Sequence, residues 1–62
     1  MGEYIGTAKA HGPDGVHTFE VWRAHGYTVT LDGKVLVTGT THTMAWTTIE
    51  RTAEERGWRR AA

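Results

Sequence analysis

Apolar and polar residues alternate along four short runs in the first part of the chain. Alternation of this kind is typical of β-strands with one buried face. Glycine-containing breaks separate the runs, and Gly-Pro-Asp-Gly at 12–15 is a strong turn signal because Pro presets φ and Gly accepts positive φ. We therefore predict an antiparallel meander with strands at about residues 3–10, 16–23, 27–31 and 34–38.

The spacing of apolar residues becomes helical after this meander and predicts a helix at about residues 42–56. The apolar positions that recur once per helical turn are Ala45, Trp46, Ile49 and Ala53. Thr41 or Thr43 would cap the start of the helix. Gly57 is placed for a left-handed C-terminal cap, with Trp58 folding back in a Schellman motif.

A lone helix cannot bury its apolar side, so the strands must form the surface on which it lies. The predicted fold is therefore α+β, an antiparallel three- to four-stranded β-meander packed on one C-terminal α-helix. Residues 1–62 would form a single small domain.

The register of the meander decides which side chains face the helix. Between the third and fourth strands, a two-residue loop would place Val29 opposite Leu36, whereas a three-residue loop pairs Val29 with Val35. Three-residue loops there and at 24–26 make one face consistently apolar, so we predict them at both turns. The predicted helix-facing residues are Tyr4, Ala8, Phe19, Val21, Tyr27, Val29, Leu31, Val35 and Val37.

The opposite face of the predicted sheet carries the strongest functional signal, a tryptophan with aliphatic neighbours in one transverse row. Exposed apolar patches mark interfaces, and tryptophan is enriched among binding hot spots. The candidate partner-binding residues are Ile5, Trp22, Thr28, Leu36, Glu20, Thr30 and Lys34. The structural alternative is that the first strand is frayed, or that Trp22 lies under a loop or the C-terminal tail.

Seven basic and seven acidic side chains give no net charge, so no long-range field would draw the chain to nucleic acid or anionic lipid. Neither a long apolar run nor a signal-peptide pattern indicates a membrane, and we expect a cytoplasmic protein without a membrane partner. The chain has no cysteine to form disulfides. Because so short a chain buries only about 60% of its unfolded surface, self-association would add useful burial.

Enzyme and metal chemistry find little support in the sequence. The chain has neither serine nor cysteine as a nucleophile. His11 and His17 flank the first turn, and Asp14 is the nearest candidate for a third metal ligand, but this spacing is not a zinc signature. We expect no catalytic residue, no metal site and no cofactor.

We therefore expect a small non-enzymatic protein–protein interaction module, either a homodimer or a binder of a different protein, that uses the open sheet face. The alternative is a nucleic-acid-binding module. Residues 16–56 are similar, in the order of their elements, to the sheet-and-helix DNA-binding domains of the plant ethylene-response type and of integrase arm-binding domains. That resemblance implies a sheet face that reads the major groove, but those families place several Arg and Trp side chains there, and we identify no family. The candidate nucleic-acid contacts are Arg23, Arg56, Trp58, Arg59 and Arg60.

Overall fold

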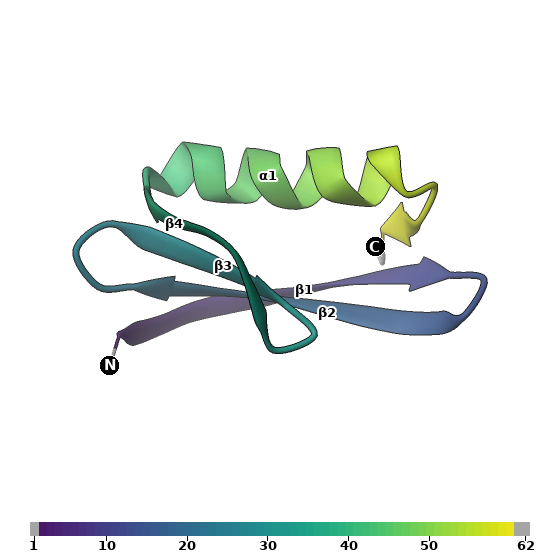
Figure 1. Ribbon diagram of the computed structural model, residues 1–62, viewed down its shortest axis with the longest axis horizontal. Coiled ribbons are helices and arrows are strands. Elements are labelled where there is room, and N and C mark those ends of the chain that lie inside the picture. Colours follow the sequence, from purple (N-terminus) through teal and green to yellow (C-terminus); the bar gives the residue numbers. More distant parts are fainter. Residues whose placement is uncertain (1, 61–62) are drawn as a thin grey trace.

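The computed structural model describes residues 2–60, which form one antiparallel sheet and one helix (Figure 1). In chain order the elements are β1 (Glu3–Gly12), β2 (Gly15–Arg23), β3 (Tyr27–Leu31), β4 (Lys34–Thr40), α1 (His42–Glu55) and β5 (Arg59–Arg60). The strand order across the sheet is β4-β3-β2-β1-β5. The predicted α+β fold is confirmed, with the short strand β5 added to the expected meander.

Helix α1 lies over one face of the sheet, and the hydrophobic core forms between them (Figure 1). The buried apolar residues are Ala10, Phe19, Val21, Val29, Leu31, Ala45, Ile49 and Ala53. Phe19 and Ile49 are the largest fully buried side chains. Each large side chain in such a core stabilises the fold by about 1.5–3 kcal/mol relative to leaving it exposed. The apolar residues at helical spacing, Ala45, Ile49 and Ala53, therefore pack α1 against the sheet.

Both ends of α1 are capped by the residues that the sequence indicated. The hydroxyl of Thr41 accepts a hydrogen bond from the backbone N–H of Met44 at 3.1 Å. At the other end Gly57 has a φ of 72°, and the backbone N–H of Trp58 donates to the Ala53 carbonyl at 2.8 Å. These contacts form the predicted N-cap and Schellman motif.

The hairpin between β2 and β3 has the predicted register. Phe19 pairs with Leu31 and Val21 pairs with Val29, which leaves the three-residue loop 24–26. Gly26 has a φ of 98°, and a Cβ atom at this position would come within 2.9 Å of the Cα atom of Gly39. The loop therefore needs glycine both for its backbone conformation and for its close approach to β4.

The turn between β3 and β4 differs from the prediction. Leu31 pairs with Lys34, so the loop contains only Asp32 and Gly33, whose φ angles are 51° and 86°. Two successive positive φ angles are the signature of a type I′ turn, whose twist matches that of the two strands. The predicted three-residue loop is therefore wrong at this turn.

An irregularity in β4 partly restores the predicted core. Thr30 pairs with Val35 and Val29 pairs with Val37, so Leu36 is an extra residue in β4. A bulge of this kind shifts the register by one residue. Val37 consequently packs against the core as predicted, whereas Val35 is turned away and 63% exposed.

A second correction concerns β1, in which the pairing with β2 is irregular between Tyr4 and Gly6. Tyr4 pairs with Trp22, and Ile5 packs against the core. The prediction had assigned Tyr4 to the helix-facing side and Ile5 to the opposite side, so both assignments are wrong. Beyond the bulge, Gly6 pairs with Val21 in the predicted register.

The residues that follow the helix continue the sheet. Arg59 pairs with His11 and Arg60 pairs with Ala10. The two arginines are therefore part of a short edge strand. Among residues 2–60, no helix is long and apolar enough to cross a membrane.

Candidate functional site

The face of the sheet that points away from α1 is the first candidate site. We call it the outer face, and it consists of Tyr4, Thr7, Lys9, His11, Val16, Thr18, Glu20, Trp22, Thr28, Thr30, Val35, Thr38 and Arg59. Figure 1 shows the helix on one side of the sheet and, within residues 2–60, no element on the other. Alternation along the strands places these residues opposite the buried ones.

An aromatic pair lies at the β1 end of one row of the outer face. The rings of Tyr4 and Trp22 meet edge to face, with centroids 5.3 Å apart and an interplanar angle of 67°. The hydroxyl of Tyr4 forms a hydrogen bond with that of Thr7, which fixes the orientation of the exposed ring. Tyr4 is 50% exposed, so a large part of this pair is available for contact.

Four of the seven predicted partner-binding residues lie together on the outer face. Trp22 pairs with Thr28, and Glu20 pairs with Thr30, in two neighbouring rows. The hydroxyl of Thr28 also forms a hydrogen bond of 2.9 Å with that of Thr38, a residue that the prediction had not included.

The other three predicted residues lie on the helix-facing side. Ile5 packs against the core, and Lys34 and Leu36 line a pocket together with the buried Leu31. The bulge at residue 5 causes the first error because it adds one residue to β1. The two-residue β3–β4 turn causes the other two, because it shifts Lys34 and Leu36 by one position from the predicted register. Tyr4 and Val35 occupy the outer-face positions instead.

The outer face carries few charges, and these charges have both signs. Its charged side chains are Lys9, Glu20 and Arg59, and Arg59 pairs with His11. Arg23, a candidate nucleic-acid contact, instead forms an ion pair with Glu3 at the end of the β1–β2 ladder. The outer face therefore presents a mixed aromatic, aliphatic and threonine surface with two basic side chains and one acidic side chain.

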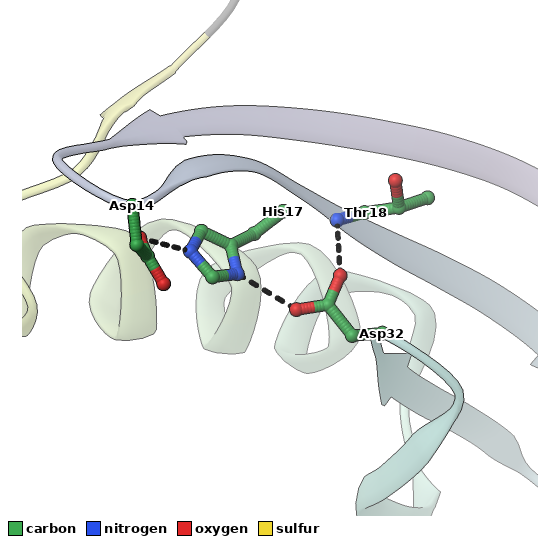
Figure 2. Close-up of polar contacts among 4 residues, drawn as sticks. All are labelled: Asp14, His17, Thr18 and Asp32. Atoms are coloured by element: carbon green, nitrogen blue, oxygen red, sulfur yellow. Dashed lines mark hydrogen bonds and ion pairs between the residues drawn. The ribbon is translucent and has the colours of Figure 1, made fainter.

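A second site, which the sequence analysis missed, lies at the opposite end of β2 and on the helix-facing side. The imidazole of His17 lies between two carboxylates, with 2.8 Å from Nε2 to Oδ1 of Asp14 and 2.7 Å from Nδ1 to Oδ2 of Asp32 (Figure 2). The other carboxylate oxygen of Asp32 accepts a hydrogen bond of 2.9 Å from the backbone N–H of Thr18. Only a protonated imidazole donates from both ring nitrogens, so this geometry favours the imidazolium form.

The charges of this cluster stabilise one another. Hydrogen bonds to Asp32 and then Asp14 raise the pKa of His17 above its ordinary value. The pKa of Asp14 is lowered mainly by its hydrogen bond with His17, and that of Asp32 mainly by the Thr18 backbone N–H and then by His17. Each carboxylate therefore stabilises the charged imidazole, and the imidazole stabilises the charged form of each carboxylate.

Trp58 completes this cluster by stacking on His17, with centroids 3.9 Å apart and planes 6° apart. The indole also lies so close to Gly12 that a Cβ atom there would be 2.6 Å from the ring. On the helix side the guanidinium carbon of Arg56 is 5.2 Å from the indole centroid. Trp58 is thus a packing residue at the end of the helix, with one ring face occupied by His17.

The candidate metal ligands are not brought together. His11 pairs with Val16 and His17 pairs with Ala10, so the two histidines lie on opposite faces of the sheet. Asp14 does contact His17, as the turn suggested, but both nitrogens of that ring are bound to carboxylates. Within residues 2–60 no group of three or more His, Cys, Asp or Glu side chains has a geometry that could hold a metal ion.

The candidate nucleic-acid contacts are also dispersed. Arg60 lies 3.8 Å from the carboxylate of Glu50, whereas Arg56 lies over Trp58 at the helix end and Arg23 lies with Glu3. Phosphate-binding surfaces gather their cations on one face or along one groove. The basic residues of this chain do not form such a surface.

Comparison of this chain with protein-family models, with curated proteins and with solved structures found no match.

Proposed function

We propose that this chain is a small non-enzymatic interaction module that associates with a second copy of itself through the outer face. The observation that carries the proposal is the pairing of Tyr4 with Trp22 on a sheet face that α1 does not cover. Tyrosine and tryptophan are the residues most enriched at the centres of protein interfaces, where their large rings are removed from water.

The side chains around the aromatic pair suit an interface. Val35 is 63% and Val16 is 52% exposed, so the outer face presents two more apolar side chains besides the aromatic pair. Threonines fill most positions between them, and their methyl groups pack while their hydroxyls form hydrogen bonds within the sheet or with a partner. These side chains therefore favour contact with a second protein surface.

The charges of the outer face favour a second copy of the chain as the partner. A two-fold axis brings the same surface of both copies together. Because Lys9 and Glu20 have opposite signs, two copies of this face can form reciprocal ion pairs, which offset the repulsion between the two Arg59 side chains.

The size of the face sets the expected strength. The molecule measures 34 × 19 × 18 Å, so a whole sheet face is slightly smaller than the roughly 800 Å² per partner of standard interfaces. We therefore expect a reversible dimer with a dissociation constant of about 1–100 μM, in the range of transient interfaces. The absence of cysteine suits a reducing compartment, and we propose the cytoplasm as the location.

Sedimentation velocity between about 10 μM and 1 mM protein tests this proposal. We expect the mass to rise from monomer to dimer across this range, and Trp22→Ala and Val35→Glu to keep the protein monomeric. Met44→Glu is the matched control, because Met44 is exposed on the helix and lies outside the outer face. A wild-type chain that stays monomeric at 1 mM, or a Met44→Glu variant that dissociates as completely as Val35→Glu, would exclude the outer face as the interface.

A further inference from the structure

A pocket of about 360 Å³ lies where the β3–β4 turn meets the C-terminal end of α1. Its lining residues are Leu31, Asp32, Lys34, Leu36 and Arg56. This volume is at the lower end of the range for small-molecule pockets and equals that of about twelve water molecules at roughly 30 Å³ each. The pocket is on the helix-facing side of the sheet, so it is separate from the proposed interface.

The apolar part of the pocket comes from two leucines. Leu31 belongs to the core and is 6% exposed, whereas Leu36 is the extra residue of the β4 bulge and is 37% exposed. Had β4 continued in the register set by the turn, Leu36 would have faced the core at a regular ladder position opposite Val29. The bulge instead leaves the Leu36 side chain at the surface beside Leu31, where an aliphatic chain can cover both leucines and release water.

The charged part of the pocket is positive. Lys34 from β4 and Arg56 from the helix end have no carboxylate within 4 Å among residues 2–60. Asp32 is the one acidic residue of the lining, and its two oxygens are bound to His17 and to the Thr18 backbone. The two cations are therefore available to an external anion, while the Asp32 charge is shared with the imidazolium.

Two nearby features support anion binding at Arg56: its contact with Trp58 and the capping of the last carbonyls of α1. Arg56 lies over the ring of Trp58, which restricts its side chain to this end of the helix. The last helix carbonyls would repel an anion, but the backbone N–H groups of Gly57 and Trp58 bind two of them.

We propose that this pocket binds a small aliphatic monocarboxylate, with its carboxylate between Lys34 and Arg56 and its chain on Leu31 and Leu36. Charge-assisted hydrogen bonds to both cations orient the anion. A single negative charge suits the site better than a dianion, because the Asp32 carboxylate lies in the same wall. A ligand of about six carbon atoms covers the two leucines while its carboxylate stays beside Lys34 and Arg56.

Titration with hexanoate, followed by ¹⁵N–¹H correlation spectra, tests the proposal at a protein concentration below that of self-association. We expect saturable shifts confined to the residues that line the pocket, with a dissociation constant of about 1 mM, as is usual for a ligand of eight non-hydrogen atoms. Hexan-1-ol lacks the charge and acetate lacks the chain, so each should bind at least about fivefold more weakly. Equal shifts from hexanoate and hexan-1-ol, or shifts spread over the surface, would overturn the proposal.

Substitutions at the two cations give a second, independent readout. Arg56→Gln and Lys34→Gln should each weaken hexanoate binding by about threefold to tenfold, the range for a partly exposed charge-assisted contact. Arg51→Gln and Lys9→Gln are the matched controls, because they remove the same charges outside the pocket. If the control variants bind hexanoate as weakly as the pocket variants, the effect comes from the overall charge of the protein, and the proposed site is excluded.

The pocket proposal and the dimer proposal can be tested independently of each other. Val35→Glu should abolish self-association and leave hexanoate binding unchanged, whereas Lys34→Gln should weaken hexanoate binding and leave self-association unchanged. Because the titration is made on the monomer, a Val35→Glu variant that loses hexanoate binding would overturn the independence of the pocket from the outer face.

Discussion

Trp58 lies flat on the imidazole of His17, with ring centroids 3.9 Å apart. The stack connects the residue that ends the Schellman motif to the second strand, while Asp14 and Asp32 connect the same imidazole to the first and third turns. One histidine thus joins four segments that are separated in the sequence. Loss of this contact should first destabilise the C-terminal end of the described chain.

The first prediction concerns pH. His17 has a raised pKa, so its contribution to stability is complete below its unfolded value of 6.5 and is lost as pH rises through the folded value. Asp14 and Asp32 have lowered pKa values, so their contribution is present above 3.8 and is lost as pH falls through their folded values. This cluster should therefore stabilise the fold most between about pH 4 and 6.5.

Urea denaturation at several pH values between 3 and 9, for the wild type and His17→Gln, measures this dependence. The wild type should lose more stability than the variant on either side of the window. His11, His25 and His42 are present in both proteins, so the comparison isolates the effect of His17. Parallel pH profiles for the two proteins would contradict the structural role of the imidazolium.

The second prediction concerns Thr30, whose hydroxyl oxygen is buried without a hydrogen-bond partner in the described part of the chain. Thr30→Val replaces this hydroxyl with a methyl group of similar shape and should stabilise the fold by about 1 kcal/mol. Thr28→Val serves as the control, because it removes the hydrogen bond to Thr38 and should not stabilise to the same extent. Chemical denaturation of the two variants side by side measures the difference.

The third prediction compares two glycines of β1 that lie beneath tryptophans. A Cβ atom at Gly12 would lie 2.6 Å from the ring of Trp58, whereas one at Gly6 would lie 3.5 Å from that of Trp46, an ordinary contact distance. Gly12→Ala should therefore destabilise by about 1–3 kcal/mol through overpacking, and Gly6→Ala by much less. Thermal unfolding followed by circular dichroism distinguishes the two, and equal losses would mean that Trp58 moves aside without cost.

The fourth prediction concerns the start of α1. Thr41→Ala removes the side-chain oxygen that accepts the Met44 N–H, and it should destabilise by about 1 kcal/mol. Thr43→Ala should be neutral or slightly stabilising, because Thr43 lies within the helix and alanine is the better helix former. The order of the two melting temperatures provides the test. If Thr43→Ala is the less stable variant, Thr41 is not the N-cap residue.

The comparison of sequence and structure shows which signals were sufficient. The capping residues and the apolar spacing of α1 predicted its bounds to within one residue at the C-terminal end, because these signals are local. The β2–β3 register was also predictable, since only one loop length buries Phe19, Val21 and Val29 together.

The bulges explain most of what could not be predicted. At the β3–β4 turn both loop lengths are compatible with Asp32-Gly33, and the argument from a consistent face assumed that β4 is regular. A bulge at Leu36 satisfies the type I′ turn and the burial of Val37 at once, and no residue type in the strand announces it. Ile5 and Tyr4 exchanged faces for the same reason.

The His17 cluster could have been found from the register that was predicted correctly. Pairing of Phe19 with Leu31 places Asp32 beside the backbone of Thr18, and the hairpin at 12–15 places Asp14 near His17. The signal was overlooked because His17 was examined as a metal ligand with His11 instead of as an ion-pair partner. Its stacking on Trp58 depends on β5, which had no counterpart in the alternation pattern.

The irregular backbone of β4 has a consequence for how copies of this protein assemble. β4 is the outermost strand on its side of the sheet, and its free edge is interrupted at Leu36 and again by Gly39, which has a φ of 69°. A kinked border of this kind is a poor template for adding strands from other molecules, which is how natural sheets avoid open-ended fibrils. This edge therefore fits the proposed closed dimer better than an open-ended polymer, and the extra Leu36 that interrupts β4 is the cause.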